Sequence, residues 1–456
     1  MPIKPILPKG TRDFSALEVA RRDYLKEILK RNFELFGFQP IETPSFERLE
    51  TLTGVYGEEG DRLVFKILNS GDKIKKANTA ALEEGADSAF IRSISEKALR
   101  YDLTVPFARY VAQHQSDLTF PFRRYQIQPV WRADRPQHGR FQEFYQCDAD
   151  SVGARSLWQE IEMISLYDRV FSELKLEGIK LKINHRKILA GVAALLDAES
   201  ELSQFTIALD KLDKIGKKGV LDELASKGFG AKALDLLENL LALSGPAEKQ
   251  LEALEILLKE EPEGLEGVNE LKFILSQLEF TPLETTTLNF DLSLARGLHY
   301  YTGMIIEVSA PEKVKMGSLG GGGRYDDLTG TFGLKEMSGI GISFGFERIY
   351  LVMETLGCFP ETLSSNAKVL IANFGEASNR IAYECLYRLR KQGISCEFYP
   401  TVAKLKKQLA YANTKKIPQV ILIGTSELTQ NQFVVKNMET GAQHAHPLET
   451  LESVLA

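Results

Sequence analysis

The strongest constraint on this 456-residue chain is a pair of alternating segments between Phe122 and Asp150, joined by a turn-forming run. Alternation of apolar and polar residues predicts two half-buried strands, each with every second side chain on one face. If the strands pair as a hairpin, Arg132 and Arg140 share a surface with Gln146 and Asp150. Arginine matches oxyanions in bidentate fashion and stays charged, so this surface suits a phosphate or carboxylate. The alternative is a strand pair with ordinary ion pairs on its solvent face.

Length and composition indicate a multidomain globular protein. At ~150 residues per domain, 456 residues predict about three domains. The chain is 44% hydrophobic and 26% charged, as is typical of soluble proteins. We expect a cytoplasmic protein without a membrane span, because no apolar run reaches about 18 residues and prolines interrupt the N-terminus. The four cysteines form no CxxC pair and the six histidines no HExxH motif, so we expect no metal held by protein side chains.

Charge is distributed unevenly along the chain. The net charge is −6, yet residues 366–456 contain eleven Lys and Arg against seven Asp and Glu. A basic C-terminal module on an acidic body is compatible with a local contact to nucleic acid. A lysine-rich helix face that is simply solvated is the alternative.

The segment from Ser15 to Phe36 predicts a long amphipathic helix. Ser15 and Glu18 have the spacing of a capping box, apolar residues follow at helical spacing, and Gly37 provides the stop. A short strand over residues 38–41 is expected next.

Asp102 and Thr104 lie at the start of another predicted helix. A carboxylate and a hydroxyl can together hold an ammonium group by charge and hydrogen bond. The alternative is that both residues only cap the helix. The polar stretch before them, residues 51–99, is interpreted as a mobile loop or an insertion over the site.

Changes in composition and in the spacing of apolar residues suggest the domain boundaries. Residues 187–284 are rich in Leu, Lys and Glu at helical spacing, which predicts a helical insertion domain or a plain structural bundle. Strands alternate with helices over residues 366–456, which predicts a small α/β domain. Residues 1–186 and 285–360 would then form a catalytic domain in two parts.

Three further features of the sequence have chemistry suited to a ligand site. Arg296 offers a fixed charge to a phosphate under attack, beside the rings of Tyr300 and Tyr301, although core packing is the alternative. The run from Gly317 to Asp327 lacks the P-loop frame, so we interpret it as a loop that lets backbone approach a substrate. Arg348 lies in the first turn of a predicted helix, whose positive end suits a triphosphate.

These strings, taken in order, resemble the class II aminoacyl-tRNA synthetases in the form of the histidyl-tRNA synthetases. WRADRPQHGRFQEFYQCDAD is similar to the second class II motif, and the strand and helix carrying FGFER resemble the third. LARGLHYYTG is similar to the histidine-specific signature, from which it departs at His299, where many members carry Asp.

The two ends of the chain carry the same resemblance. The N-terminal helix with the strand and proline after it resembles the first class II motif, whose family role is the dimer interface; a core helix at the domain edge is the alternative. Residues 366–456 resemble the anticodon-binding domain of histidyl, threonyl, prolyl and glycyl enzymes.

The resemblance implies an α+β fold, with an antiparallel sheet flanked by helices, a helical insertion domain and a C-terminal α/β anticodon-binding domain. It also implies a homodimeric ligase. Such an enzyme activates L-histidine with ATP and Mg²⁺ to histidyl-adenylate and pyrophosphate, then transfers histidine to the 3′-terminal adenosine of tRNA(His).

Residue roles follow from the same motifs, as expectations. Two arginines would neutralise the α-phosphate during catalysis: Arg132 and Arg296. Four residues would bind ATP: Arg132, Asp134, Arg140 and Arg348. Eight would hold histidine: Asp102, Thr104, Arg132, Gln146, Asp150, Arg296, Tyr300 and Tyr301.

Two other functions compete with this interpretation. One is a non-catalytic, synthetase-like regulatory paralogue of histidine biosynthesis, which normally lacks the C-terminal domain found here. The other is a different class II synthetase with the same C-terminal domain, against which the LARGLHYYTG string argues.

Overall fold

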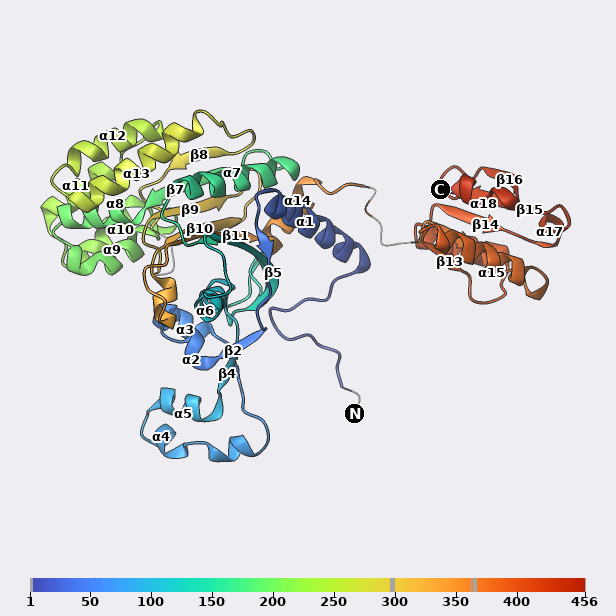
Figure 1. Ribbon diagram of the computed structural model, residues 1–456, viewed down its shortest axis with the longest axis horizontal. Helices are drawn as coiled ribbons and strands as arrows, with labels where there is room; N and C mark the ends of the chain where they lie inside the picture. The colour runs from blue at the N-terminus through green and yellow to red at the C-terminus, as the bar shows by residue number, and fades with distance from the viewer. Residues whose placement is uncertain (1–2, 296–299, 362, 364–366, 456) are drawn as a thin grey trace. The chain divides into compact units, whose positions relative to one another are not determined.

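The computed structural model describes residues 3–295, 300–361, 363 and 367–455. The chain forms two compact units, Met1–Pro360 with an eight-stranded and a three-stranded sheet, and Glu361–Ala456 with a five-stranded sheet (Figure 1). In the part of the chain that is described, no helix is long and apolar enough to cross a membrane.

An eight-stranded, mainly antiparallel sheet is the centre of the first unit. Its strands follow in the order β1 (Gln39–Pro40), β5 (Phe122–Trp131), β6 (Glu143–Val152), β11 (Gly339–Gly345), β10 (Gly320–Tyr325), β9 (Met304–Ser309), β7 (Lys180–His185) and β8 (Thr287–Phe290). Only the edge strands β1 and β8 run parallel to their neighbours. The predicted α+β class, with helices around an antiparallel sheet, is confirmed.

The hairpin of β5 and β6 forms as the alternation predicts. Gln128 lies opposite Gln146 in its ladder. Pairing stops before Arg132 and resumes after Arg140, so both arginines lie in the connection between the strands. On its other edge β6 pairs antiparallel with β11, which places Gly345 opposite Gln146. Strand β6 is therefore held on both sides.

Three helices pack together against β6 and β11: α1 (Ala16–Leu35), α7 (Trp158–Glu173) and α14 (Phe346–Leu356). The predicted capping box begins α1, because the Glu18 N–H donates to Ser15 and the Ser15 N–H donates to Glu18. Phe33 of α1 packs against Tyr125 and Phe344, with ring centroids 5.3 and 5.7 Å apart. These contacts join the helix to the centre of the sheet.

Residues 51–99 are folded, so the interpretation as a loop is wrong for most of them. They contain α3 (Gly57–Leu63), η1 (Gly71–Lys76), α4 (Thr79–Glu83) and α5 (Asp87–Ile94), and they follow α2 (Leu49–Leu52). A small sheet orders β2 (Phe46–Arg48), β4 (Lys97–Leu99) and β3 (Lys66–Ile67). Leu52, Tyr56 and Val64 bury against Ala98, at the start of the segment that leads into α6 (Thr104–His114). The elements are too short for their periodicity to stand out.

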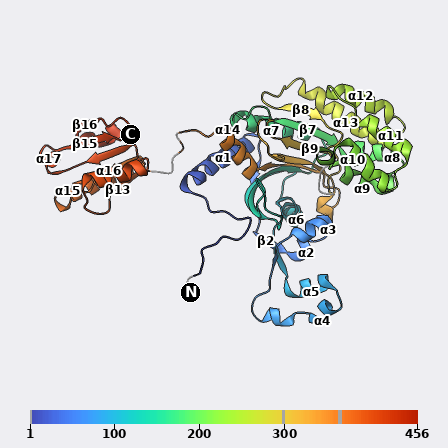
Figure 2. The same cartoon turned by 180° about the vertical axis from the view of Figure 1, so that it is seen from behind.

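Helices fill most of the predicted stretch 187–284, as its helical spacing indicates. They are α8 (Arg186–Leu195), η2 (Glu199–Glu201), α9 (Leu202–Leu209), α10 (Leu212–Ser226), α11 (Ala231–Leu240), α12 (Ala247–Leu257) and α13 (Pro262–Leu278). Figure 2 shows them gathered beside β7 and β8. Gly191 of α8 faces Gly264 of α13, and an added Cβ at Gly191 would lie 2.7 Å from the Gly264 Cα. The two helices therefore approach closely because neither carries a side chain there.

The second unit is a five-stranded sheet covered on both faces. Its strands are ordered β13 (Cys396–Phe398), β12 (Val369–Ile371), β14 (Gln419–Leu422), β15 (Gln432–Asn437) and β16 (Gln443–Pro447). Its helices are α15 (Glu376–Lys391), α16 (Leu405–Thr414), α17 (Thr425–Thr429), η4 (Leu448–Thr450) and α18 (Leu451–Leu455). Val369 and Ile371 enter one core and Leu370 the other, as the period of two requires.

We expect Gly191→Val to destabilise the first unit. The new side chain would collide with α13, and overpacking of this kind costs about 1–3 kcal/mol. The gain in helix propensity over glycine is only a few tenths of a kcal/mol. Calorimetry should show a lower melting temperature, whereas Gly230→Val, where an added Cβ meets nothing within 4 Å, should lose less. Equal losses would contradict the close approach.

Candidate active site

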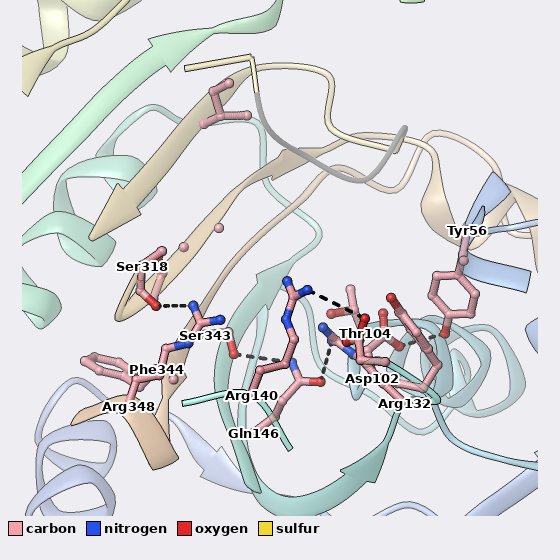
Figure 3. Close-up of a pocket in the computed structure, with 18 of the residues that line it drawn as sticks. Tyr56, Asp102, Thr104, Arg132, Arg140, Gln146, Ser318, Ser343, Phe344 and Arg348 are labelled. Atoms are coloured by element: carbon pink, nitrogen blue, oxygen red, sulfur yellow. Dashed lines mark hydrogen bonds and ion pairs between the residues drawn. The ribbon is translucent and has the colours of Figure 1, made fainter. Parts of the chain in front are cut away.

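A pocket of about 810 Å³ lies among the β5–β6 connection, strand β10 and the first turn of α14 (Figure 3). Nine of the eleven residues predicted from sequence line it: Asp102, Thr104, Arg132, Asp134, Arg140, Gln146, Tyr300, Tyr301 and Arg348. Of the other two, Asp150 lies behind the lining, and Arg296, like His299, lies outside the described residues. Residues far apart in the sequence thus meet in one cavity.

Arg348 marks one end of the pocket. It is the third residue of α14, and its guanidinium donates to the carbonyl oxygens of Gly139 at 3.0 Å and Ser318 at 2.7 Å. A Cβ at Gly317 would lie 3.2 Å from the same guanidinium, so the glycine leaves it room. The helix N-terminus adds its own partial positive charge. This end of the pocket is therefore suited to an anion.

Arg132 is oriented by contacts on several sides. Its Nε donates to the Tyr101 carbonyl at 3.0 Å and its Nη2 donates to the Gln146 side chain at 3.2 Å. Its guanidinium also lies over the rings of Tyr101 and Phe144, at 4.3 and 5.2 Å from their centroids. The Gln146 amide in turn donates to Ser343 Oγ of β11 at 3.3 Å. The hairpin and β11 together fix this charge.

Arg140 is held more loosely. Its Nη1 lies 3.8 Å from Asp134 Oδ1, and its side chain is partly exposed. An exposed ion pair at this distance contributes little to stability. Both groups are therefore available to a ligand that enters between Arg132 and Arg348.

The far end of the pocket is acidic and aromatic. Asp102 is only 1% exposed, and its Oδ1 accepts hydrogen bonds from the Tyr56 hydroxyl at 2.8 Å and the Val105 N–H at 3.1 Å. The bond from Val105 caps α6, so the capping alternative for Asp102 holds alongside its place in the pocket. Burial raises the pKa of Asp102, and the hydrogen bond from Val105 and the nearby charge of Arg132 oppose that rise. Thr104 interacts with the side chain of Tyr300.

Asp150 does not reach the pocket surface. Its Oδ2 lies 2.8 Å from the Arg124 guanidinium, and its Oδ1 accepts a hydrogen bond from the Tyr325 hydroxyl at 2.5 Å. Arg124 and Asp150 are both buried. The carboxylate therefore has protein partners, and a direct contact with a ligand stays a prediction.

The glycine-rich run forms strand β10 rather than the predicted loop. Gly320, Gly321 and Gly322 line the pocket, and Gly322 lies opposite Ile342 of β11. A Cβ at Gly322 would lie 2.1 Å from the carbonyl oxygen of Gly341. Four successive glycines read as a loop in the sequence, yet here they keep the pocket floor free of side chains.

Sequence reasoning assigned no role to Tyr56 or Asp148. No sequence signal links Tyr56 to Asp102, because the two are 46 residues apart. Asp148 did carry a signal, since the period of two places it on the same face as Gln146 and Asp150. Its pKa is raised to about 7, chiefly by burial and with a contribution from the nearby Asp150, while the charge of Arg124 opposes the rise. Its carboxylate accepts from the Gln146 amide at 3.4 Å.

Two family models and several known proteins match the sequence of this chain. The family model described as "Histidyl-tRNA synthetase" matches residues 92–349, and the model described as "Anticodon binding domain" matches residues 368–456. The histidine–tRNA ligase of Christiangramia forsetii is 56% identical over 440 residues, 96% of each chain. That of Flavobacterium johnsoniae is 52% identical and covers 100% of each chain.

Solved structures agree with these relatives. The crystal structure of histidyl-tRNA synthetase from Nostoc sp. PCC 7120 matches with a TM-score of 0.83 at 28% identity, over 99% of both chains. An ATP phosphoribosyltransferase regulatory subunit/histidyl-tRNA synthetase from Bacillus halodurans matches with a TM-score of 0.73 at 23% identity, over 93% of this chain and 100% of that one. The second match concerns the fold alone.

We expect Asp148→Asn to flatten the dependence of stability on pH. A carboxyl whose pKa is about 7 in the folded state keeps its proton where the unfolded chain, near 3.8, has lost it. The folded state then binds more protons, so stability falls as pH rises from about 4 to 7, by on the order of a few kcal/mol. Urea midpoints at pH 5 and 8 should differ less in Asp148→Asn than in the wild type. The exposed control Asp235→Asn should show the same difference between the two midpoints as the wild type. The same difference in Asp148→Asn would refute the role of Asp148 in the pH dependence.

Proposed function

The chain belongs to the histidyl-tRNA synthetase family, and from this premise we propose how its pocket joins histidine to tRNA(His). It is a histidine–tRNA ligase, an enzyme that uses ATP as a substrate. The histidine carboxylate attacks the α-phosphate of ATP, which forms histidyl-adenylate and releases pyrophosphate. A ribose hydroxyl of the 3′-terminal adenosine of the tRNA then attacks the carbonyl carbon of the adenylate, which forms the ester and releases AMP. One observation carries the site assignment: the predicted residues Arg132, Arg140 and Arg348 and the buried carboxylate of Asp102 line a single pocket.

The arginines act on the phosphates. Arg132, oriented by Tyr101 and Gln146, lies between the two ends of the pocket and neutralises charge on the α-phosphate. Arg140 and Arg348 hold the remaining phosphates. Such groups accelerate transfer of the adenylyl group mainly through positioning and fixed charge, as in phosphoryl transfer, since the reaction needs little covalent help from the protein. By resemblance Arg296 adds a second charge at the α-phosphate.

Mg²⁺ accompanies ATP in this proposal. Among the residues with described placement, no cluster of three or more His, Cys, Asp or Glu side chains forms a metal cage. Mg²⁺ is commonly held by one or two carboxylates together with phosphates and water. Asp134, which lines the pocket beside Arg140, would supply such a carboxylate. The ion would neutralise charge on the phosphoryl oxygens.

Histidine occupies the acidic and aromatic end. Asp102 and Thr104 bind its ammonium group, while Gln146 and Arg132 lie on the side toward the phosphates. Tyr300 and Tyr301 form the wall against its imidazole, with ring centroids 4.8 Å apart. Asp150 acts from behind, through Arg124 and Tyr325.

The division of the chain follows from this site. Residues 1–186 and 285–360 form the catalytic domain, residues 187–284 the helical insertion domain, and residues 366–456 the anticodon-binding domain. The enzyme acts as a cytoplasmic homodimer. Support for a dimer comes from α1, whose Leu17, Val19 and Leu35 are exposed apolar side chains on the helix that resembles the first class II motif.

The regulatory paralogue is not favoured as an alternative. Curated relatives near 50% identity over the whole chain are ligases, and the C-terminal domain that such paralogues normally lack matches residues 368–456.

The test of this function is ATP–pyrophosphate exchange by the purified chain with each of the twenty amino acids, without tRNA. Exchange should depend on histidine alone, because only an amino acid that fits the pocket is activated. Exchange with another amino acid would refute the assignment of the pocket, and no exchange by a folded protein would refute the activity. Arg296→Ala should fold and lose exchange; normal exchange by this variant would refute the role of Arg296.

We propose that α15 contacts unpaired bases of the tRNA. Arg380, Tyr383, Tyr387 and Lys391 follow at helical spacing, and the tyrosines are 57% and 65% exposed. Exposed rings stack on unpaired bases, while the adjacent cations meet phosphates.

Stacking of this kind is worth about 1–3 kcal/mol per base, so Tyr387→Ala should raise the KM for tRNA about fivefold or more. Tyr387→Phe, which keeps the ring, should bind tRNA nearly normally. Aminoacylation kinetics over a range of tRNA concentrations measure both. Histidine-dependent exchange without tRNA should not change in either variant. An unchanged KM for tRNA in Tyr387→Ala would exclude this face.

A further inference from the structure

Tyr56 reaches the amino-acid end of the pocket from an element that carries none of the predicted site residues. It lies directly before α3, is only 5% exposed and lines the pocket together with Asp102. Figure 3 shows its hydroxyl pointing at Asp102, and the two oxygens are 2.8 Å apart. The contact links the folded segment after β2 to the start of α6.

The two oxygens of Asp102 have different surroundings. Oδ1 accepts from both Tyr56 and the Val105 N–H. Oδ2 is buried and has no hydrogen-bond partner among the described residues. A buried acceptor left unpaired destabilises the protein, and more so when it is charged. A ligand that brings a cationic donor to Oδ2 removes this cost.

Packing fixes the Tyr56 ring in place. Its centroid lies 4.7 Å from that of Tyr101, and the ring belongs to a core with Leu52, Val64 and Ala98. A Cβ at Gly60 would lie 2.4 Å from the Tyr56 Cβ, so the glycine in α3 leaves space for the tyrosine. The hydroxyl is therefore held at Asp102 by contacts that do not involve a ligand.

We infer that Tyr56 is a positioning residue for the amino acid: it holds Oδ1 of Asp102 so that Oδ2 faces the substrate ammonium group. The inference rests on the proposed binding of histidine by Asp102 and adds to it a residue from outside the three class II motifs. Tyr56 itself need not touch the substrate. It acts through the orientation and charge of the carboxylate.

Several charged and titratable groups act on Asp102 together with Tyr56. They are Arg132, Arg124, Asp148, Tyr101, Tyr300 and Tyr301. Burial raises the pKa of Asp102, and the hydrogen bond from Tyr56 opposes that rise. Loss of the hydroxyl leaves the other groups in place, so the carboxyl should then take up a proton at higher pH.

Tyr56→Phe tests the inference, since it removes the hydroxyl and keeps the ring. Without this hydrogen bond Oδ1 is no longer held and Oδ2 can turn away from the ammonium group, so the KM for histidine in exchange should rise on the order of tenfold, which corresponds to about 1.4 kcal/mol of lost binding. The KM for ATP should change less than about twofold, and kcat should change little because the lost interaction serves ground and transition states alike. The acid limb of kcat/KM for histidine should move to higher pH.

The matched control is Tyr125→Phe. It removes another tyrosine–carboxylate hydrogen bond, from Tyr125 to Glu34 at 3.0 Å, outside the pocket. Its KM for histidine and its pH profile should match the wild type. A rise in KM for histidine equal to that of Tyr56→Phe would mean that general loosening of the fold explains both, and would overturn the inference.

Asp102→Asn separates failure of the inference from failure of its premise. If Asp102→Asn leaves the KM for histidine unchanged, the proposed role of Asp102 is wrong. If Asp102→Asn raises it and Tyr56→Phe does not, only the role of Tyr56 is wrong. In the double variant, Tyr56→Phe should add little to Asp102→Asn, because Tyr56 acts through that carboxylate. Fully additive effects of the two substitutions on the KM for histidine would overturn the inference. Tyr56→Phe would then act independently of Asp102, for example by weakening the fold.

Discussion

The site depends on the pairing of β6 with strands on both of its edges. Because β5 and β11 fix its register, Gln146 lies at one height in the sheet, opposite Gln128 on one side and Gly345 on the other. Arg132 is oriented by Gln146, and α14 begins directly after Gly345. A slip of one residue would turn these side chains to the opposite face. One ladder thus sets the positions of both ends of the phosphate region.

Buried charge pairs extend this control to the helices. Glu347 accepts two hydrogen bonds from Arg22 of α1, at 2.5 and 2.8 Å, and it precedes Arg348 in the first turn of α14. Removing one partner of such a buried pair costs about 3–5 kcal/mol, because the other is left uncompensated. Helix α1 therefore helps to fix the orientation of Arg348 in the pocket.

Local patterns made much of this fold predictable, while contacts across the chain did not. The capping box at Ser15 and the hairpin around Gln146 depend on neighbours in sequence, and both form as expected. Nine pocket residues were found because whole motifs carry them. The bond between Tyr56 and Asp102 and the burial of Asp150 behind Arg124 depend on tertiary packing, which periodicity does not reveal. The glycine run forms a strand although glycine is common in loops, because the close packing of β10 against β11 leaves no room for side chains there.

Strand β10 has a consequence for how this pocket can change over time. The strand forms the floor of the pocket at Gly320, Gly321 and Gly322, where only backbone is present. Any side chain at Gly322 would collide with β11. An inhibitor that lay against this floor would touch atoms common to every amino acid. Resistance by substitution would then have to arise at the walls, where Arg140 and its neighbours are exposed, and those walls also serve the substrate. The glycine strand is thus the part of the site where the fewest substitutions could give resistance to an inhibitor.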